Sequence, residues 1–278
     1  MTAEGPNAAQ VAYWNAAGGE AWAGAHEALE RQIRPLGEAA LAALAPQAGE
    51  RIIDIGCGAG ATSLALAAAV GPAGRVVGVD VSRPLLAIAE ARGARAPNLR
   101  FIEADAQTHG FDHGGFDAAF SRFGVMFFAD PAAAFANIRT ALRPGGRLAF
   151  VCWRGLAEND WMRVPLMAAM PLLPPMPPPD PEAPGPFALA DRARIEAILD
   201  SAGFAEVAIR AHDCGIGGHD LATTTGLLLR VGPLGAVLRE SPELAPKVEA
   251  AVAGALAPHE RDGGIWLPGA VWIVTARA

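Results

Sequence analysis

The sequence predicts an α/β protein whose core is an open, doubly wound parallel sheet. Short β-branched or apolar runs alternate with helix-forming runs between residues 51 and 153, and alternating strands and helices build right-handed βαβ units with parallel strands. In addition, the run at 51–55 leads through a glycine-rich turn into helix-forming residues at 61–70. Such a turn lies at the edge where open α/β sheets bind their ligands.

The composition fits one large domain, or one domain with a substantial insertion, in a chain of 278 residues. Hydrophobic residues make up 52% and charged residues 18%, which leaves enough apolar side chain for a core. The formal net charge of −7 argues against a nucleic-acid-binding protein, because such proteins carry clustered lysine and arginine. Small molecules are therefore the expected partners.

Three cysteines, at Cys57, Cys152 and Cys214, lie far apart in the sequence, and none belongs to a C-x-x-C pair. We expect reduced thiols in the core, without a disulfide framework or a structural zinc. No cluster of His, Asp or Glu has the spacing of a metal site, so no metal is predicted. The N-terminus lacks the basic and apolar regions of a signal peptide, and the apolar helix at 61–70 is too short to span a bilayer. These features predict a cytoplasmic protein without membrane insertion.

Residues 8–48 are expected to be helical, with a break at Pro35 and an end near Pro46. We interpret residues 1–48 as an N-terminal helical lid over the glycine turn. Each of its aromatic side chains, taken alone, could be an ordinary packing anchor. The concentration of aromatic side chains in this segment, in a chain with only one tyrosine, favours a pocket wall.

The glycine turn itself fits two classes of cofactor site. Gly56, Gly58 and Ala61 satisfy the G-x-G-x-x-G/A fingerprint of dinucleotide binding, and Gly60 extends the pattern to D-x-G-x-G-x-G. Glycine suits this place because a residue without Cβ adopts positive φ and lets a ligand approach the backbone. The turn alone does not decide between the two classes.

The predicted strand at 51–55 carries Asp54 near its end, and two further strands are expected to end in an acid. The strand at 75–82 carries Asp80 about 20 residues beyond the glycines, the spacing at which a carboxylate accepts hydrogen bonds from ribose hydroxyls. The alternative role for Asp80, capping the helix that begins at Pro84, suits Ser82 better. The strand at 99–106 carries Asp105 at the same edge. An edge with three acids is suited to binding hydrogen-bond donors.

The next elements complete a pattern that resembles a known family. A fourth strand is predicted at 116–123, an apolar loop at 124–128, a helix from 131 to 142, a turn at 143–146 and a fifth strand at 147–153. The D-x-G-x-G-x-G turn, Asp80, Asp105 and the Arg-Pro-Gly-Gly turn at 143–146, taken in this order, resemble the class I S-adenosylmethionine-dependent methyltransferases. The similarity is nearest to the small-molecule branch that includes the ubiquinone/menaquinone C-methyltransferases, and it covers roughly residues 48–155.

This resemblance implies a Rossmann-like seven-stranded sheet of order 3-2-1-4-5-7-6 with an antiparallel last strand. It also implies the cofactor, S-adenosylmethionine, and the product, S-adenosylhomocysteine. Asp54 and the turn would hold the methionine part, Asp80 the ribose, and Asp105 the adenine, while Arg122 would lie near the methyl group. The full set of cofactor residues implied in this way is Tyr13, Trp22, Asp54, Gly56, Cys57, Gly58, Asp80, Val81, Asp105, Ala106 and Ser121.

The charge of Asp54 favours this cofactor over NAD. A carboxylate in the turn would repel a pyrophosphate, whereas it suits a ligand that carries an ammonium and a sulfonium group. At an effective dielectric constant near 20, a carboxylate a few ångströms from a cation contributes roughly 4 kcal/mol before its desolvation is counted.

The rest of the chain follows the resemblance more loosely. A short helix at 161–170, a Pro-rich loop at 171–186, a helix at 191–202, a strand at 206–210, helices at 223–238 and 242–256 and a last strand at 270–277 are expected. We interpret residues 49–278 as the methyltransferase domain, with substrate-covering insertions at about 155–190 and 215–265. For the Pro-rich loop, an extended polyproline connection is the alternative.

Methyl transfer needs alignment of nucleophile, methyl and sulfur, and it needs a general base only if the acceptor must lose a proton. His26 and His219 are the histidines expected within reach of a substrate, although a surface or structural role would also explain them. Arg122 could bind an acceptor carboxylate or pair with a neighbouring acid. The enzyme could also work without a general base.

The predicted function is transfer of a methyl group from S-adenosylmethionine to O, N or C of a small, largely apolar acceptor. Two alternatives remain at this stage, an NAD-dependent oxidoreductase and a non-catalytic module that binds S-adenosylmethionine. The apolar C-terminal segments would allow a homodimer.

Overall fold

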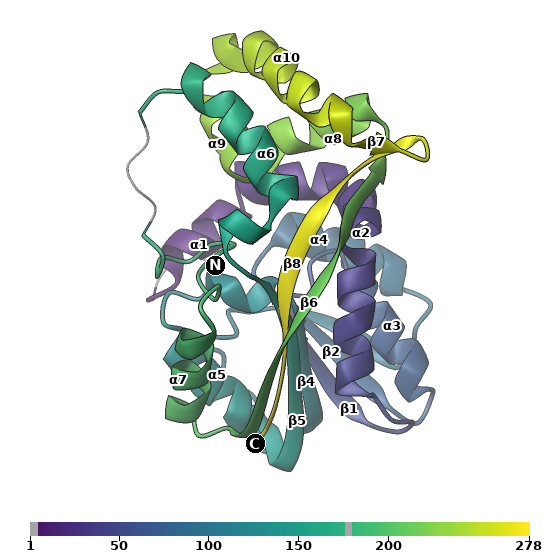
Figure 1. Cartoon of the computed structure of the whole chain (residues 1–278). Helices are drawn as coiled ribbons and strands as arrows, with labels where there is room; N and C mark the ends of the chain where they lie inside the picture. Colours follow the sequence, from purple (N-terminus) through teal and green to yellow (C-terminus); the bar gives the residue numbers. More distant parts are fainter. Residues whose placement is uncertain (1–4, 176–179) are drawn as a thin grey trace.

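The fold is an open α/β sheet with helices on both faces and a helical body above one edge (Figure 1). The computed structural model describes residues 5–175 and 180–278. The strands run in the order β3-β2-β1-β4-β5-β8-β6, and the short β7 pairs with β8. Strand β8 is antiparallel to both of its long neighbours, and the strands from β3 to β5 are mutually parallel. The predicted order is therefore confirmed. The strands are β1 (Arg51–Ile55), β2 (Arg75–Asp80), β3 (Leu99–Glu103), β4 (Phe116–Arg122), β5 (Leu142–Trp153), β6 (Ala205–His219), β7 (Glu260–Arg261) and β8 (Gly264–Arg277).

Helices cover the two faces of the sheet in the doubly wound arrangement. Helices α2, α3 and α4 lie on one face, and α5 and α7 lie together on the other (Figure 1). The helices are α1 (Ala8–Trp14), α2 (Ala17–Leu44), α3 (Ala61–Val70), α4 (Arg83–Gly93), α5 (Pro131–Ala141), α6 (Asp160–Ala169), α7 (Arg192–Ser201), α8 (Leu221–Arg230), α9 (Gly232–Glu240) and α10 (Ala245–Leu256).

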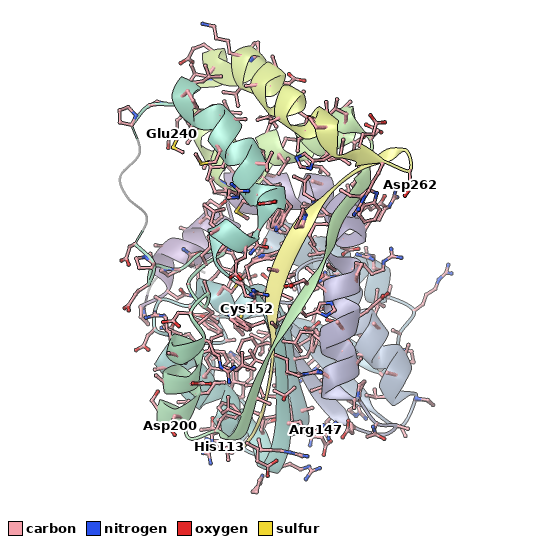
Figure 2. All side chains as sticks on the ribbon, in the orientation of Figure 1. His113, Arg147, Cys152, Asp200, Glu240 and Asp262 are labelled. Atoms are coloured by element: carbon pink, nitrogen blue, oxygen red, sulfur yellow. The ribbon has the colours of Figure 1, made fainter. Side chains whose placement is uncertain are left out.

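The main core lies between the sheet and these two helical layers. Ile52, Ile53, Phe120 and Phe150 are fully buried on the central strands, as expected for strands that are covered on both faces. Figure 2 places Cys152 in this interior, and burial raises the pKa of its thiol above the ordinary value. All three cysteines are free thiols, of which Cys57 and Cys152 are buried and Cys214 is partly buried. The labelled charged side chains lie at the periphery of the molecule (Figure 2).

The expected break at Pro35 is wrong, because α2 continues through the proline to Leu44. Figure 1 shows the helix changing direction along its length, and a proline inside a helix removes one backbone hydrogen bond and favours such a kink. Leu36, Ala40 and Leu44 beyond the proline are buried in the main core. Tertiary packing therefore carries the helix past a residue that would end an isolated one.

The β6–β8 ribbon is much longer than the sequence predicts. The expected strands at 206–210 and 270–277 are the lower parts of a ribbon that extends to His219 and Gly264. The glycines near the end of β6 weaken the sequence signal of the strand, since glycine is unfavourable inside strands. Gly217 needs to be glycine because a Cβ there would lie 1.8 Å from the Ile265 carbonyl oxygen, and the pairing register shifts at this point.

The sequence predicts a turn at 143–146, whereas in the structure these residues form the first part of β5. The pairing of β4 with β5 shifts register between Phe116 and Ala118, opposite this segment. Gly145 has φ of 74°, so the chain still turns there as the glycine pattern predicts.

The two predicted insertions meet in one body above the sheet, which we call the helical cap and define as α6, α8, α9 and α10 (Figure 1). The cap has its own apolar core, which includes Leu234, Val248, Val252 and Leu256 and continues onto the top of β8. The helix expected at 223–238 is two helices, α8 and α9, which are divided at Gly232 with φ of 70°. Part of the predicted Pro-rich connection, residues 176–179, lies outside the described residues.

Within the described part of the chain, no single helix has the length and hydropathy to cross a membrane. Helices α8 and α9 meet such a test only as a pair, and they are bent by 67° where they join.

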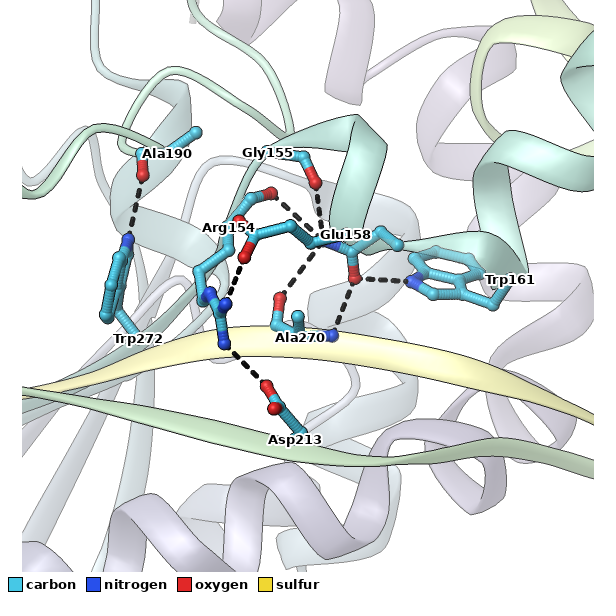
Figure 3. A network of polar contacts seen from close by, with 9 residues as sticks. Arg154, Gly155, Glu158, Trp161, Ala190, Asp213, Ala270 and Trp272 are labelled. Atoms are coloured by element: carbon cyan, nitrogen blue, oxygen red, sulfur yellow. Dashed lines mark hydrogen bonds and ion pairs between the residues drawn. The ribbon is translucent and has the colours of Figure 1, made fainter.

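A buried polar network fastens the start of the cap to β8 (Figure 3). The amide nitrogen of Asn159 donates to the carbonyl oxygens of Arg154, Gly155 and Ala270 at 3.0–3.1 Å. Its amide oxygen accepts from the backbone N–H of Ala270 at 2.9 Å and from the indole N–H of Trp161 at 3.2 Å. Asn159 is fully buried, so these five contacts set the angle at which α6 leaves the sheet.

The neighbouring arginine extends this network to the partner strand of the ribbon. Arg154 donates to Asp213 on β6 at 2.6 Å, forms an ion pair with Glu158, and lies over the ring of Trp272 on β8. The indole N–H of Trp272 in turn donates to the Ala190 carbonyl oxygen at 2.8 Å (Figure 3).

We expect Asn159→Asp to destabilise the protein by about 2–4 kcal/mol. The carboxylate has no N–H to donate, so it would face three carbonyl oxygens that now accept from the amide of Asn159. Urea denaturation at neutral pH measures this change. The neighbouring variant Asp160→Asn, at a partly exposed residue that pairs with Arg163, should change the free energy of unfolding by less than about 1 kcal/mol. Equal stabilities of the two variants would contradict the role given to Asn159.

Candidate functional site

A deep, mainly apolar cavity opens at the carboxyl ends of β1 to β4 and continues upward beneath the helical cap. Three parts of the chain line it: the edge of the sheet, the N-terminal helices and the cap. The sheet edge contributes Ile55, Gly56, Cys57, Gly58, Val79, Asp80, Val81, Ala104, Asp105, Ala106, Arg122 and the 123–128 segment, the N-terminal helices contribute Trp14, Trp22, Leu29, Gln32 and Ile33, and the cap contributes Trp161, Met162, Pro165, Leu166, Leu228 and residues 231–234.

The glycine turn needs glycine for two different reasons. Gly56 has φ of 67°, and a Cβ there would lie 2.7 Å from the Cα of Gly124, so the two backbones meet too closely for a side chain. Gly58 has φ of 53° and nothing lies within 4 Å of the position that a Cβ would take. At Gly56 the turn therefore packs against Gly124 in the segment after β4, and at Gly58 it leaves open space.

The backbone amides of the turn already have acceptors within the protein. Gly56 and Cys57 donate to the Val79 carbonyl oxygen at 2.8 and 3.1 Å, and Gly60 donates to the Cys57 carbonyl oxygen at 3.0 Å. Gly58 donates to the carboxylate of Asp80 at 2.7 Å. A turn that binds a pyrophosphate must offer such amides to its ligand. In this turn the amides of Gly56, Cys57 and Gly58 hold the loop against β2, and that of Gly60 closes the turn itself.

Asp80 accepts two backbone amides and still faces the cavity. One carboxylate oxygen accepts from Gly58 and the other from Ser82, at 2.7 and 2.8 Å. Burial raises the pKa of Asp80 above its ordinary value, and the two amide hydrogen bonds oppose that rise. Since a carboxylate accepts about four hydrogen bonds, the side chain can also accept from two ligand hydroxyl groups.

Asp54 lies behind the glycine turn and does not line the cavity. Its Oδ2 accepts from the hydroxyl groups of Thr62 and Ser63 at 2.7 and 2.6 Å, at the start of α3. Its Oδ1 is buried without a hydrogen-bond partner among the described residues. Burial raises the pKa of Asp54 from 3.8 to about 6, although the two hydroxyl groups and Arg122 act in the opposite direction.

Arg122, Gln32 and Gln10 line the cavity without a side-chain hydrogen bond or ion pair to any described residue. Arg122, at the end of β4, lies against α2, where a Cβ on Gly37 would be 2.8 Å from its Cδ. Burial lowers the pKa of Arg122, and Glu30 and Asp54 act in the opposite direction. Gln32 lies on the cavity face of α2 and is 8% exposed.

The N-terminal segment is fixed to the sheet edge by side-chain hydrogen bonds. Asn7 donates to Asp105 at 3.3 Å, beside the predicted adenine position. Asn15 donates to the Val81 carbonyl oxygen at 2.7 Å and accepts from the first backbone amide of α4 at 3.0 Å. Ser82, which the sequence suggests as the cap of α4, donates instead to the Trp14 carbonyl oxygen at 2.8 Å.

Two groups of aromatic rings line the cavity. In the first, Trp14 contacts Trp22 and Phe127 edge to face, with centroids 6.0 and 5.2 Å apart. In the second, Phe123 stacks on Trp153 at 4.3 Å, and Trp153 contacts Trp161 of the cap at 4.7 Å. The strand, the N-terminal helices and the cap thus contribute to one aromatic enclosure.

Of the three predicted catalytic residues, only Arg122 reaches the cavity. His26 lies on the outer side of α2 next to α4, and its Nδ1 is 2.7 Å from the Ala23 carbonyl oxygen of its own helix. His219 is buried at the end of β6, and its Nε2 is 3.0 Å from the Ala28 carbonyl oxygen. It therefore connects the ribbon to α2.

Three predicted cofactor residues, Asp54 included, lie outside the cavity. Tyr13 is 37% exposed and packs on the outer edge of Trp14, which takes the place at the wall. The hydroxyl group of Ser121 is buried without a partner among the described residues, near Gly124. The remaining predicted residues line the cavity, namely Trp22, Gly56, Cys57, Gly58, Asp80, Val81, Asp105 and Ala106.

The sequence prediction did not include Gln32, Trp153 or Trp161 as site residues. Gln32 carries a usable signal, because Leu29, Gln32 and Ile33 follow the spacing of one helix face and a glutamine interrupts the apolar residues there. Trp153 and Trp161 carry no such signal. They meet only because the long β6–β8 ribbon brings the cap close to the sheet, and the sequence does not predict that ribbon.

Known proteins resemble this chain most clearly over the sheet and its glycine turn. Residues 53–150 match the model of a family described as a methyltransferase domain. The aklanonic acid methyltransferase DauC of Streptomyces sp. (strain C5) is 36% identical over 118 residues, which are 42% of this chain and 54% of the relative. The demethylmenaquinone methyltransferase of Thermus thermophilus is 42% identical over 103 residues, which are 37% of this chain and 46% of the relative. The chain spans about half the length of these curated relatives.

A solved structure extends the likeness to most of the chain. The phosphoethanolamine N-methyltransferase 2 of Haemonchus contortus, in complex with S-adenosyl-L-methionine, superposes with a TM-score of 0.53. The match covers 87% of this chain and 52% of that chain, at 19% sequence identity. This likeness shows the fold and confirms the predicted Rossmann-like arrangement.

The pKa of Asp54 gives a pH-dependent test of the site. A carboxyl group whose pKa is raised by folding stabilises the folded state when protonated, so its contribution is lost as pH rises from 3.8 through about 6. The ionised side chain then costs roughly 3 kcal/mol. We expect the free energy of unfolding of Asp54→Asn, relative to the wild type, to rise by up to about 3 kcal/mol between about pH 4 and pH 7.

Denaturant unfolding of both proteins across this pH range, without added ligand, measures the difference. The introduced asparagine can still accept a hydrogen bond from a hydroxyl group at the start of α3, so the comparison mainly removes the charge. A difference that stays constant with pH, or that falls toward neutral pH, would contradict the assignment.

Proposed function

We propose that the chain transfers a methyl group from S-adenosylmethionine to a small, largely apolar acceptor, and the match of residues 53–150 to a methyltransferase domain supports this proposal. The observation that carries the proposal is one continuous cavity with two chemically different parts. Its lower part ends at Asp80 and Asp105 on the sheet edge, and its upper part is enclosed by aromatic and aliphatic side chains of the lid and cap.

The lower part fits S-adenosylmethionine residue by residue. Asp80 can accept from the ribose hydroxyl groups, Val81 and Ala106 can cover the adenine faces, and Asp105 can accept from the adenine amine. The open side of Gly58 leaves space for the methionine part beside the turn. Arg122 supplies a guanidinium group, unpaired among the described residues, for the carboxylate of the methionine part.

Asp54 then acts from behind the turn. Its contacts with Thr62 and Ser63 fix the start of α3, and its charge favours a cation on the other side of the loop. We therefore propose Asp54 as a positioning residue, in contrast to the direct contact that the resemblance implies.

An NAD-dependent oxidoreductase is less compatible with the same site. The four glycine-turn amides donate to Val79, Asp80 and Cys57, so a pyrophosphate would have to break these hydrogen bonds. The charge of Asp54 behind the turn would also oppose it. Binding of S-adenosylmethionine without turnover would support the non-catalytic alternative.

When bound, S-adenosylmethionine supplies a methyl group that its sulfonium has already activated. The protein has to exclude water and hold the acceptor in line, and such orientation can contribute about 7–11 kcal/mol in favourable cases. The aromatic groups around Trp14 and Trp153 supply the enclosure. Neither His26 nor His219 reaches the cavity, so the proposal assigns no histidine base.

The division into a lid of residues 1–48 and a domain of residues 49–278, with the insertions covering the substrate, is part of the proposal. The contacts of Trp14, Trp22 and the cap with the cavity support it. A cytoplasmic location and a homodimer remain predictions from the sequence.

Isothermal titration calorimetry with S-adenosylhomocysteine tests the proposal, and a micromolar dissociation constant is expected. Asp80→Ala should weaken this affinity about 10- to 100-fold, because it removes charge-assisted hydrogen bonds worth about 1.5–3 kcal/mol. Glu103→Ala is the matched control, since Glu103 pairs with Asp80 in strand register but forms an exposed ion pair with Arg83. Absence of binding to the wild type would overturn the proposal.

Arg122→Met separates the two ends of the cofactor site. We expect the affinity for S-adenosylhomocysteine to fall about 10- to 100-fold, since the variant loses a guanidinium–carboxylate pair. The affinity for methylthioadenosine, which lacks the amino-acid part, should change by less than about threefold. Equal losses for both ligands would show that Arg122 supports the fold of the cavity and does not bind the carboxylate.

A further inference from the structure

Among the described residues, no side chain that lines the cavity beneath the cap could remove a proton from an acceptor. This lining comes from the two aromatic groups and from Met162, Pro165, Leu166, Leu228 and residues 231–234. In the whole described lining, the ionisable side chains are Cys57, Asp80, Asp105 and Arg122. Each of these lies at the sheet edge.

None of these four groups is placed to act as a base for the acceptor. In the proposed function Asp80 binds the ribose and Asp105 the adenine, so both carboxylates lie at the cofactor end of the cavity. Burial raises the pKa of the Cys57 thiol well above its ordinary value, so it remains protonated at neutral pH. Arg122 is a cation.

Gln32 is a hydrogen-bond donor that remains for an anionic acceptor when Arg122 binds the carboxylate of the methionine part. Arg122 and Gln32 both line the cavity, and neither has a hydrogen-bond partner among the described residues. Gln32 lies on α2 between Leu29, which packs with Leu227 of the cap, and Gly37, which Arg122 contacts. It can donate a hydrogen bond at the border of the apolar part. The sulfonium of the bound cofactor would add positive charge at the same border.

We propose that the acceptor is an oxyanion on a flat apolar body, an aromatic carboxylate or an acidic phenol that enters already ionised, and that Gln32 donates a hydrogen bond to it. This inference rests on the proposed methyl transfer and names the acceptor class for the same site. The flat body would occupy the space between the Trp14 and Trp153 groups. An ammonium acceptor would meet the positive charge of the sulfonium and no base.

The proposed reaction balances without a proton transfer on the enzyme. The acceptor oxygen forms a bond to the methyl carbon while the carbon–sulfur bond breaks, and the electron pair of that bond remains on sulfur. The acceptor loses its proton to water before it binds. Opposite charges on oxygen and sulfur disappear in this step, so a cavity that excludes water lowers the barrier relative to bulk water.

Calorimetry with three probes of similar shape tests the proposal. The probes are 2-naphthoate, the neutral 2-naphthamide and the cationic 2-naphthylmethylammonium. Each is titrated into protein saturated with S-adenosylhomocysteine, and separately into protein saturated with sinefungin, which carries an ammonium group in place of the sulfonium methyl. We expect 2-naphthoate to bind at least tenfold more tightly than 2-naphthamide in the sinefungin complex, and the ammonium probe to bind most weakly.

The preference for the anion should be smaller in the S-adenosylhomocysteine complex, because the positive charge at sulfur is absent. In Gln32→Leu, the affinity for 2-naphthoate should fall at least fivefold, while that for S-adenosylhomocysteine stays within about threefold. Equal affinities for the three probes, or tightest binding of the ammonium probe, would overturn the proposal. A loss of S-adenosylhomocysteine affinity in Gln32→Leu would overturn the role of Gln32.

These outcomes are separable from failure of the proposed function. If the wild type binds neither S-adenosylhomocysteine nor sinefungin, the methyltransferase proposal fails. If it binds both and prefers the cationic probe, only the acceptor inference fails.

Discussion

The carboxylate of Asp80 connects the three parts on which the site depends. It accepts the amide of Gly58 from the glycine turn and the amide of Ser82 at the start of α4, and the hydroxyl group of Ser82 donates to the Trp14 carbonyl oxygen in the N-terminal segment. Because the Val79 carbonyl oxygen takes up two more amides of the turn, the loop is fixed to β2 before any ligand arrives. A preorganised loop of this kind loses little conformational freedom on binding. It also has few free donors for a phosphate group.

The site retains polar groups whose burial opposes folding. Asp54 is fully buried with one oxygen unpaired among the described residues, and the hydroxyl group of Ser121 is unpaired in the same sense. Arg122 is a partly buried cation without an ion pair in the described part of the chain. Such groups are usually removed or paired in a stable core. Their concentration around one cavity fits the charged cofactor that we propose for it, since perturbed polar groups gather at functional sites.

The sheet and its acid-bearing edge could be predicted because local patterns determine them. Periodicity and short connections determine the order of the strands and the glycine turn. They also determine which strands end near an acid, at Asp54 and at Asp80. The side of the sheet that Asp54 faces could not be predicted, since both faces of β1 are buried and apolar. The cap was harder still. Its two halves are far apart in sequence, and the glycines of β6 conceal the long ribbon that brings Trp161 to Trp153.

We propose that the backbone amides of the glycine turn donate to acceptors within the protein, and that a sulfonium cofactor binds beside the turn. Nuclear magnetic resonance of ¹⁵N-labelled protein tests this claim at the atoms concerned, through the backbone amide resonances of Gly56, Cys57 and Gly58. We expect S-adenosylhomocysteine to shift these resonances saturably at micromolar concentrations, and pyrophosphate to leave them unchanged at millimolar concentrations. Saturable shifts with pyrophosphate, without a response to S-adenosylhomocysteine, would contradict the account.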